Sequence, residues 1–544
     1  MVRLPVVYVR GFAGGTSGIN KQVDDPFYGF NDGSTHVRVG GDGDPTFYQF
    51  ESPLLRLMID EDYRLLVRGD QHSYLSSRGD KTVPPNSIWI HRFYDAAATT
   101  FSVPPERGFI GRTWDEVRGR VAAPAGFNIE TAARDLYNLI TLIREKTDAD
   151  KVYLVAHSMG GLVARCMIQK ISQMTDEDGN PRIHAHDLVE KFFTYATPHG
   201  GIDFDISVLD WAMEAFGPAG ADIFAPDRMY GYLTKDANWG DQAPQGWDPQ
   251  VIDEKIFDPK NIFCLVGTNP ADYGLSQEAV GPKSDGLVKI DKAYVRQANR
   301  AFVHRSHSGR YGEVNSEEGY QNLRRFLFGK YKIKVDMCRV TLPDRRPNDV
   351  WQADVRVAVR GLPIVLHEQL ASHYCPVQLN KELTQHRDEP DTPTPLATAF
   401  LLDPADFDAT GDPPAPRSRY TLSLRVFHLA EKHDRFFWGS HLEQVADWED
   451  TLIVDVGRRN DEAASTLRAW IAWNSEVAGA IDDFDPITDA LPREEDRRDM
   501  TFTRQGDDLS CEIPLPEISR RILGEAACIK LTISHSQQQA ATGA

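Results

Sequence analysis

The stretch "KVYLVAHSMGGLVARCMIQ", residues 151–169, constrains the fold of this chain more than any other. Its first part, Val152 to Val155, is a short apolar run of strand-forming residues, which is typical of a buried parallel strand. After Ser158 a helical spacing begins, carried by Leu162, Val163, Cys166 and Met167. The segment therefore predicts a strand, a sharp turn and a helix, the unit from which parallel α/β sheets are built.

Ser158 lies at the turn itself, and its neighbours are small. Ala156, Gly160 and Gly161 leave room for a tight bend, so the serine oxygen is expected to be exposed at the apex. This is the geometry of the nucleophile elbow, G-x-S-x-G, with alanine in place of the first glycine. A chance serine in a strand-to-helix turn is the alternative, and the strand and helix around it favour the nucleophile.

A serine nucleophile also needs a base, a group that orients the base, and donors for the oxyanion. The opening "LPVVYVRGFAGG" predicts a strand over residues 6–9 and then a glycine-rich turn. We expect the backbone N–H groups of Phe12 and Met159 to form the oxyanion hole. A phosphate-binding loop is the alternative for these glycines, but no Lys-Ser/Thr pair follows them.

The acid is expected after a later strand. "NIFCLVGTN", residues 261–269, predicts that strand, and Asp285 follows it in S-D-G-L-V. Asp272 is the rival because it lies closer to the end of the strand. Asp285 is favoured because the Gly-Leu-Val after it is similar to the D-G-x-V turn of many lipases.

The base is expected last, before a final helix. Phe302 and Val303 predict a strand on which His304 still lies, whereas His307 falls in the loop beyond, in S-H-S-G. We therefore favour His307 as the base and interpret His304 as structural. The final helix is predicted from about residue 315 to Gly329, with Tyr320, Leu323 and Leu327 at helical spacing.

These segments, in this order, resemble the α/β-hydrolase lipases, especially the small bacterial lipases and the PGAP1-like (GPI inositol-deacylase-like) group. The resemblance covers about residues 4–329, most tightly the elbow, the Asp and His segments and "TYATPHGG" at 194–201. It implies a serine ester hydrolase with a triad that needs no cofactor and no metal. The triad would consist of Ser158, Asp285 and His307. Arg10 replaces the histidine of the usual H-G-x, and neither it nor Ala156 removes a catalytic group.

Two intervals are longer than the connections that the strands of the predicted sheet require. Residues 16–86 form the first and are expected to wall the pocket at the carboxyl edge of the sheet. Residues 202–255 form the second and predict a lid or cap over an acyl groove, with substrate contacts from Leu209, Met213 and Phe216. Between them, residues 128–150 predict an amphipathic helix with Asn128 as its N-cap.

The second part of the chain has a different pattern. After Gly329, alternating strand-like runs such as "KYKIKVDMCRVTL" and "RYTLSLRVFHL" are separated by Pro, Asp and Gly. We therefore predict an α/β-hydrolase domain over residues 1–329, with a mainly parallel sheet and an inserted lid. A β-sandwich-like accessory domain is predicted over residues 330–544, ending in a disordered tail.

The length and net charge of the chain limit its possible organisation and functions. A chain of 544 residues predicts two domains, and a net charge of −20 argues against a nucleic-acid partner. The opening residues lack an apolar signal core and no run is long enough to span a bilayer. The six cysteines are scattered along the sequence, and we interpret them as reduced thiols. We therefore expect a cytoplasmic protein, with signal-independent secretion still open.

The resemblance and the apolar inserts together predict an enzyme acting on lipid-like esters. Membrane contact without an integral span remains open, as do acyl transfer and the oligomeric state. A phospholipase that attacks membranes as an antibacterial effector is one alternative. An inactive hydrolase fold that serves as a binding or scaffold protein is another, and the presence of all three candidate triad residues argues against it.

Overall fold

The computed structural model describes most of the chain in separate ranges, and these fall into two compact units. The first unit comprises residues 1–300 and 304–323, and the second comprises 301–303 and 324–544. The described ranges are 3–11, 35–39, 45–49, 53–67, 71–91, 128–176, 178–202, 222–271, 281–307, 312–343, 350–359, 362, 364–380, 392–402, 417–429, 446–458, 467–477, 498–506 and 508–536.

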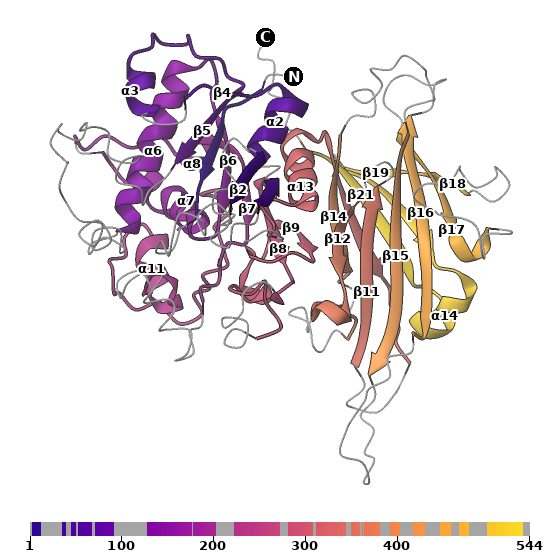
Figure 1. Cartoon of the computed structure of the whole chain (residues 1–544). Helices are drawn as coiled ribbons and strands as arrows, with labels where there is room; N and C mark the ends of the chain where they lie inside the picture. The colour runs from indigo at the N-terminus through magenta and orange to yellow at the C-terminus, as the bar shows by residue number, and fades with distance from the viewer. Residues whose placement is uncertain are drawn as a thin grey trace, which may run out of the picture. The chain divides into compact units, whose positions relative to one another are not determined.

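The first unit is built on a seven-stranded parallel sheet in the order β4-β5-β1-β6-β7-β8-β9 (Figure 1). The parallel α/β fold predicted from the sequence is confirmed. The strands span Val6–Val9 (β1), Arg64–Leu65 (β4), Ser87–His91 (β5), Val152–His157 (β6), Val189–Tyr195 (β7), Ile262–Gly267 (β8) and Asn299–Val303 (β9).

Helices cover this sheet on both sides. In Figure 1, α6 (Ile129–Lys146) lies to the left of the strands and α2 (Pro53–Glu61) to the right. Two-sided cover explains why β1 and β6 are buried along their whole length and apolar in nearly every position. Further helices among the described residues are α3 (Gln71–Ser76), α7 (Met159–Gln169), α8 (Ala185–Leu188), α11 (Pro226–Leu233) and α13 (Glu317–Phe328).

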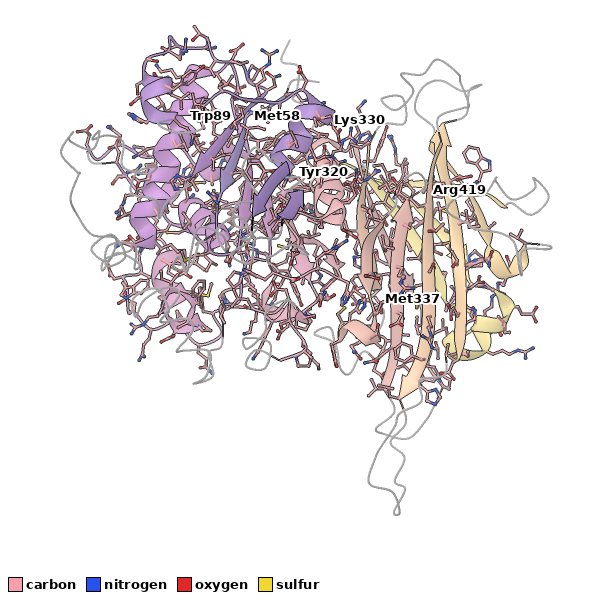
Figure 2. The ribbon with its side chains drawn as sticks, viewed as in Figure 1. Met58, Trp89, Tyr320, Lys330, Met337 and Arg419 are labelled. Atoms are coloured by element: carbon pink, nitrogen blue, oxygen red, sulfur yellow. The ribbon has the colours of Figure 1, made fainter. Side chains whose placement is uncertain are left out.

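The interval 16–86, which the sequence predicts to be an insert, contributes a strand and a helix to the first unit. Its β4 forms the edge of the main sheet, and a hairpin of β2 (Thr35–Val39) and β3 (Pro45–Gln49) precedes α2. Figure 2 labels Tyr320 on α13, whose hydroxyl donates to Asp60 on α2 at 2.8 Å. Arg56 on α2 also forms an ion pair with Glu317 on α13. Part of the interval is therefore core structure.

The second unit contains two antiparallel sheets, in the orders β14-β10-β21-β20-β19 and β12-β11-β15-β16-β17-β18, with β13 paired to β11. The predicted β-rich C-terminal region is confirmed. Its elements are β10 (Tyr331–Cys338), β11 (Val350–Val359), β12 (Val365–Gln369), β13 (Val377–Gln378), β14 (Thr394–Leu401), β15 (Arg417–Leu429), β16 (Trp448–Arg458), β17 (Leu467–Trp473), β18 (Arg498–Thr501), β19 (Thr503–Gln505), β20 (Asp508–Pro514), α14 (Glu517–Leu523) and β21 (Cys528–His535).

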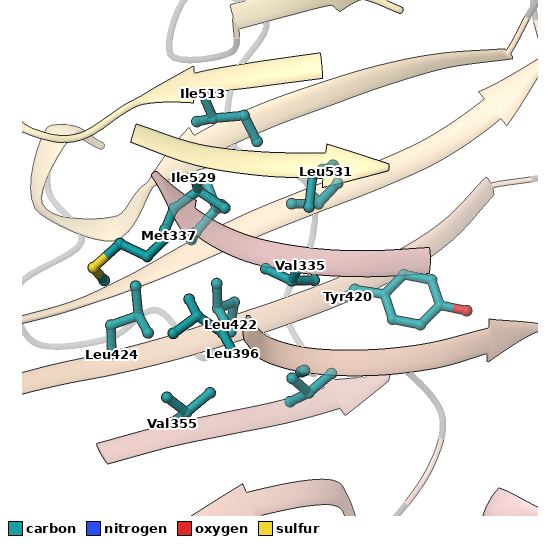
Figure 3. Packing of buried hydrophobic residues seen from close by; sticks show 14 of the residues in the cluster. Val335, Met337, Val355, Leu396, Tyr420, Leu422, Leu424, Ile513, Ile529 and Leu531 are labelled. Atoms are coloured by element: carbon teal, nitrogen blue, oxygen red, sulfur yellow. The ribbon is translucent and has the colours of Figure 1, made fainter. Parts of the chain in front are cut away.

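One apolar cluster joins the two sheets of the second unit. Figure 3 shows Met337 on β10 and Ile529 on β21 facing Leu424 on β15, and all three are buried. Residues of alternate positions point into this cluster, as the period of a strand requires. The sandwich-like packing follows from the alternating pattern that the sequence shows.

No described helix is both long enough and apolar enough to cross a membrane.

Candidate active site

The turn after β6 holds Ser158 in a backbone conformation that few residues adopt. Its φ is 52° and its ψ is −128°, between the end of β6 at His157 and the start of α7 at Met159. A positive φ at a residue with a Cβ costs free energy and is typical of functional turns. The predicted strand, sharp turn and helix are therefore all present.

Two glycines allow the strand-to-helix turn to pack closely against its neighbours. A Cβ on Gly160 would lie 2.5 Å from the Arg10 carbonyl oxygen, and one on Gly161 would overlap the Thr197 side chain. A Cβ at position 161 would displace the buried Thr197 side chain, and one at position 160 would require the backbone at the end of β1 to move. This contact puts the residues that follow β1 next to Ser158.

Three side chains from distant parts of the chain meet at this turn. The Ser158 Oγ lies 3.0 Å from the His307 Nε2, and the His307 Nδ1 lies 2.9 Å from the Asp285 Oδ2. A carboxylate can only accept, so the Nδ1 carries the proton in the neutral ring and the Nε2 is free to accept from the serine hydroxyl. All three side chains are buried, and Ser158 is 6% exposed.

The turn around Asp285 fixes its carboxylate. The Oδ1 accepts from the N–H groups of Leu287 at 2.9 Å and Val288 at 2.7 Å, which leaves the Oδ2 for the His307 ring. Gly286 has a φ of 101°, a region that favours glycine, so the glycine of S-D-G-L-V shapes this turn. The His307 N–H also donates to the Asp285 carbonyl at 2.8 Å, which ties the two loops together.

His157, beside Ser158, contacts the backbone of His307. Its Nε2 lies 3.1 Å from the His307 carbonyl oxygen, which can only accept, so the Nε2 carries the proton. Burial first, and the nearby His307 second, lower the pKa of His157 well below its usual value. A neutral, donating His157 therefore positions the backbone of His307.

A second buried acid, Glu313, lies next to the Asp285 site. It is fully buried, and its Oε2 accepts from the Ala196 N–H at 3.2 Å. Its Oε1 fills the space that a Cβ on Gly267 would need. Burial first, and the charge of Asp285 second, raise the pKa of the Glu313 carboxyl well above its usual value. Both effects favour the protonated form of the Glu313 carboxyl.

Buried hydrogen bonds hold the segment "TYATPHGG" beside α7. The His199 Nε2 lies 3.1 Å from the Thr194 Oγ1, and the His199 carbonyl accepts from Arg165 on α7 at 3.1 Å. Arg165 is completely buried, and burial lowers its pKa to about 10. No pattern in the sequence points to Arg165 or Glu313, because single charged residues carry no local signal of burial.

The structure describes some of the other predicted site residues and not others. Met159 is buried at the first position of α7, where a backbone N–H has no acceptor within its own helix. His304 is exposed, and its Nδ1 lies 3.3 Å from the Thr268 Oγ1, outside the Ser158 site. The remaining candidates, Phe12, Leu209, Met213, Phe216 and the rival acid Asp272, lie outside the described residues.

Across the described ranges, no three His, Cys, Asp or Glu side chains gather in a way that could hold a metal ion.

The parallel sheet, the strained serine turn and the adjacent histidine define an α/β fold of the hydrolase type.

Comparison with known families points to the same class. A family model described as "Putative serine esterase (DUF676)" matches residues 122–217, which include α6, β6, the Ser158 turn and α7. The match supports an esterase- or lipase-like hydrolase and contains nothing specific to the PGAP1-like group. No curated protein matches the chain.

Proposed function

We propose that the chain is a serine carboxylic-ester hydrolase that cleaves lipid-like esters through an acyl-enzyme on Ser158. One observation carries the proposal: His307 lies within hydrogen-bond reach of both Ser158, at 3.0 Å, and Asp285, at 2.9 Å. A nucleophile, a base and a group that orients the base are the minimum set for this chemistry.

The proposed mechanism follows from these contacts. The His307 Nε2 takes the proton of the Ser158 hydroxyl as its Oγ attacks the ester carbonyl, and Asp285 stabilises the imidazolium that forms. The N–H groups of Met159 and Phe12 hold the developing oxyanion. His307 then protonates the leaving alcohol, and water activated by the same ring releases the acid.

The substrate class is inferred from the apolar residues of the interval 202–255 and from the burial of the nucleophile. Ser158 is only 6% exposed. A membrane phospholipid is the second candidate substrate, and activity on phospholipid vesicles but not on monomeric esters would favour it.

The test is hydrolysis of p-nitrophenyl esters from acetate to palmitate by the wild type and by matched variants. Ser158→Ala and His307→Ala should each reduce kcat by at least about four orders of magnitude, because triad members act as a unit. His304→Ala is the control, since this exposed histidine lies outside the site. Equal activity of Ser158→Ala and wild type would refute the proposal. A wild type inert on both esters and vesicles would favour a scaffold role.

A further inference from the structure

The second unit contains a pair of cysteines that the hydrolase site does not involve. Cys338 is the last residue of β10 and Cys528 is the first residue of β21, and the two lie directly opposite each other in the antiparallel ladder. Directly opposite residues have Cα atoms about 4.5 or 5.5 Å apart, depending on the type of pair. Both values fall in the range of about 4.4–6.8 Å that a disulfide requires.

The two thiols also point to the same side of the sheet. Their neighbours Met337 and Ile529 belong to the apolar cluster between the sheets, so Cys338 and Cys528 lie on the opposite, outer face. Opposite Cβ atoms are about 4.5–5.5 Å apart, against about 3.5–4.5 Å in a disulfide. Closing the bond therefore needs an approach of about 1 Å or less, at the end of a strand pair.

Arg339 supplies a positive charge to one of the two sulfurs. Its guanidinium donates to the Cys528 Sγ at 2.9 Å and to the Glu512 carboxylate at 2.8 and 3.0 Å. The charge of Glu512 opposes this effect at Cys528. At Cys338, the charge of Asp336 raises the pKa and that of Lys530 lowers it. A hydrogen bond from Cys338 and the charge of Arg339 lower the pKa of Cys528 to about 7.

A partly exposed side chain lies against the pair. The cysteines are 6% and 3% exposed, and the Arg339 side chain that contacts Cys528 is itself half exposed. Movement of Arg339 would therefore widen the access of a small oxidant to the Cys528 sulfur.

We propose that Cys338 and Cys528 form a reversible redox site, a dithiol that a peroxide converts to a cross-strand disulfide. The Cys528 thiolate attacks one peroxide oxygen, the O–O bond breaks, and water leaves after protonation, which gives a sulfenic acid at Cys528. The Cys338 sulfur then attacks the Cys528 sulfur, and the hydroxyl leaves with the Cys338 proton as a second water. The two sulfurs lose two electrons in total and the peroxide gains them.

The disulfide would join the first and last strands of the second unit. Between Cys338 and Cys528 lies nearly the whole of that unit, so the bond constrains a long loop in the unfolded chain. We therefore expect the oxidised protein to unfold at a higher temperature than the reduced protein, and a thiol reductant to reverse the shift.

The experiment uses the full chain. Reduced protein is treated with hydrogen peroxide, quenched with N-ethylmaleimide and digested without reduction. We expect a peptide carrying Cys338 joined to one carrying Cys528, with the mass of both less two hydrogen atoms. Cys511 is the internal control, because it points into the apolar cluster and faces Leu531 rather than a thiol. It should stay reduced.

Three variants separate the parts of the proposal. Cys338→Ser should stop at an oxidised Cys528 that a sulfenic-acid reagent captures. Arg339→Gln should slow the reaction at neutral pH several-fold, because less of Cys528 is thiolate, and Arg339→Lys should retain most of the rate. Failure of the joined peptide to form in folded wild type, or oxidation of Cys511 at the same rate, would overturn the proposal whatever the variants do.

Discussion

At the scale of the residue, the conformation of Ser158 has a measurable cost. Its φ of 52° with a ψ of −128° is accessible to glycine and unfavourable for any residue with a Cβ. We expect Ser158→Gly to be more stable than Ser158→Ala by about 1–2 kcal/mol, because both remove the hydroxyl but only glycine relieves the strain. Urea denaturation of the two variants measures the difference. Equal stabilities would mean that the turn is not strained.

Glu313 predicts a pH dependence of stability. Its folded-state pKa is raised, by burial and then by Asp285, so folding favours the protonated form. The free energy of unfolding should therefore fall as pH rises from the unfolded-state pKa of about 4.3 until Glu313 ionises in the folded state, by up to about 1.4 kcal/mol per pH unit. Glu313→Gln keeps an acceptor for Ala196 and cannot ionise, so it should remove this loss.

The measurement is the free energy of unfolding against pH for wild type, Glu313→Gln and Glu525→Gln. Glu525 is an exposed glutamate and should leave the slope unchanged. The advantage of Glu313→Gln over wild type should be absent at acidic pH and grow toward neutral pH. An advantage that does not change with pH would show that the carboxyl is already ionised in the folded state.

At the scale of the element, α6 depends on its N-cap. The Asn128 Oδ1 accepts from the N–H groups of Glu130 at 2.8 Å and Thr131 at 3.1 Å, and the cap predicted from the sequence is confirmed. Asn128→Ala should destabilise the protein by about 1 kcal/mol, whereas Asn128→Ser should retain most of the stability. Chemical denaturation of the pair checks this, and equal losses would mean that the cap bonds contribute nothing.

The strands show which parts of the sheet local sequence patterns predict and which they do not. β1 begins and ends where the apolar run does, and β6 extends it by two residues to His157. β4 is only two residues long and half exposed, so no periodicity marks it as an edge strand. Its place in the sheet comes from pairing with β5 through Arg64 and Leu65, which is a long-range contact.

At the scale of the whole molecule, β21 is central to the second unit although it comes last in the chain. It pairs with β10 on one side and β20 on the other. Removal of residues 515–544 should therefore abolish the trypsin resistance of the second unit, because β10 and β20 lose their shared neighbour. Removal of residues 537–544 is the control, since it leaves the whole of β21, which ends at His535, in place. Resistance that survives the longer deletion would contradict this view of the sheet.

The sequence by itself determined the strand, turn and helix around Ser158, the two contrasting halves of the chain, and Asp285 and His307 as favoured companions. These features depend on periodicity and on small residues at a tight turn, which act between near neighbours. Only the tertiary structure decided that His307, 149 residues from Ser158, lies between it and Asp285. It alone revealed Glu313 beside that acid and Cys338 opposite Cys528. Such contacts depend on the order and register of strands far apart in the chain, which no local pattern specifies.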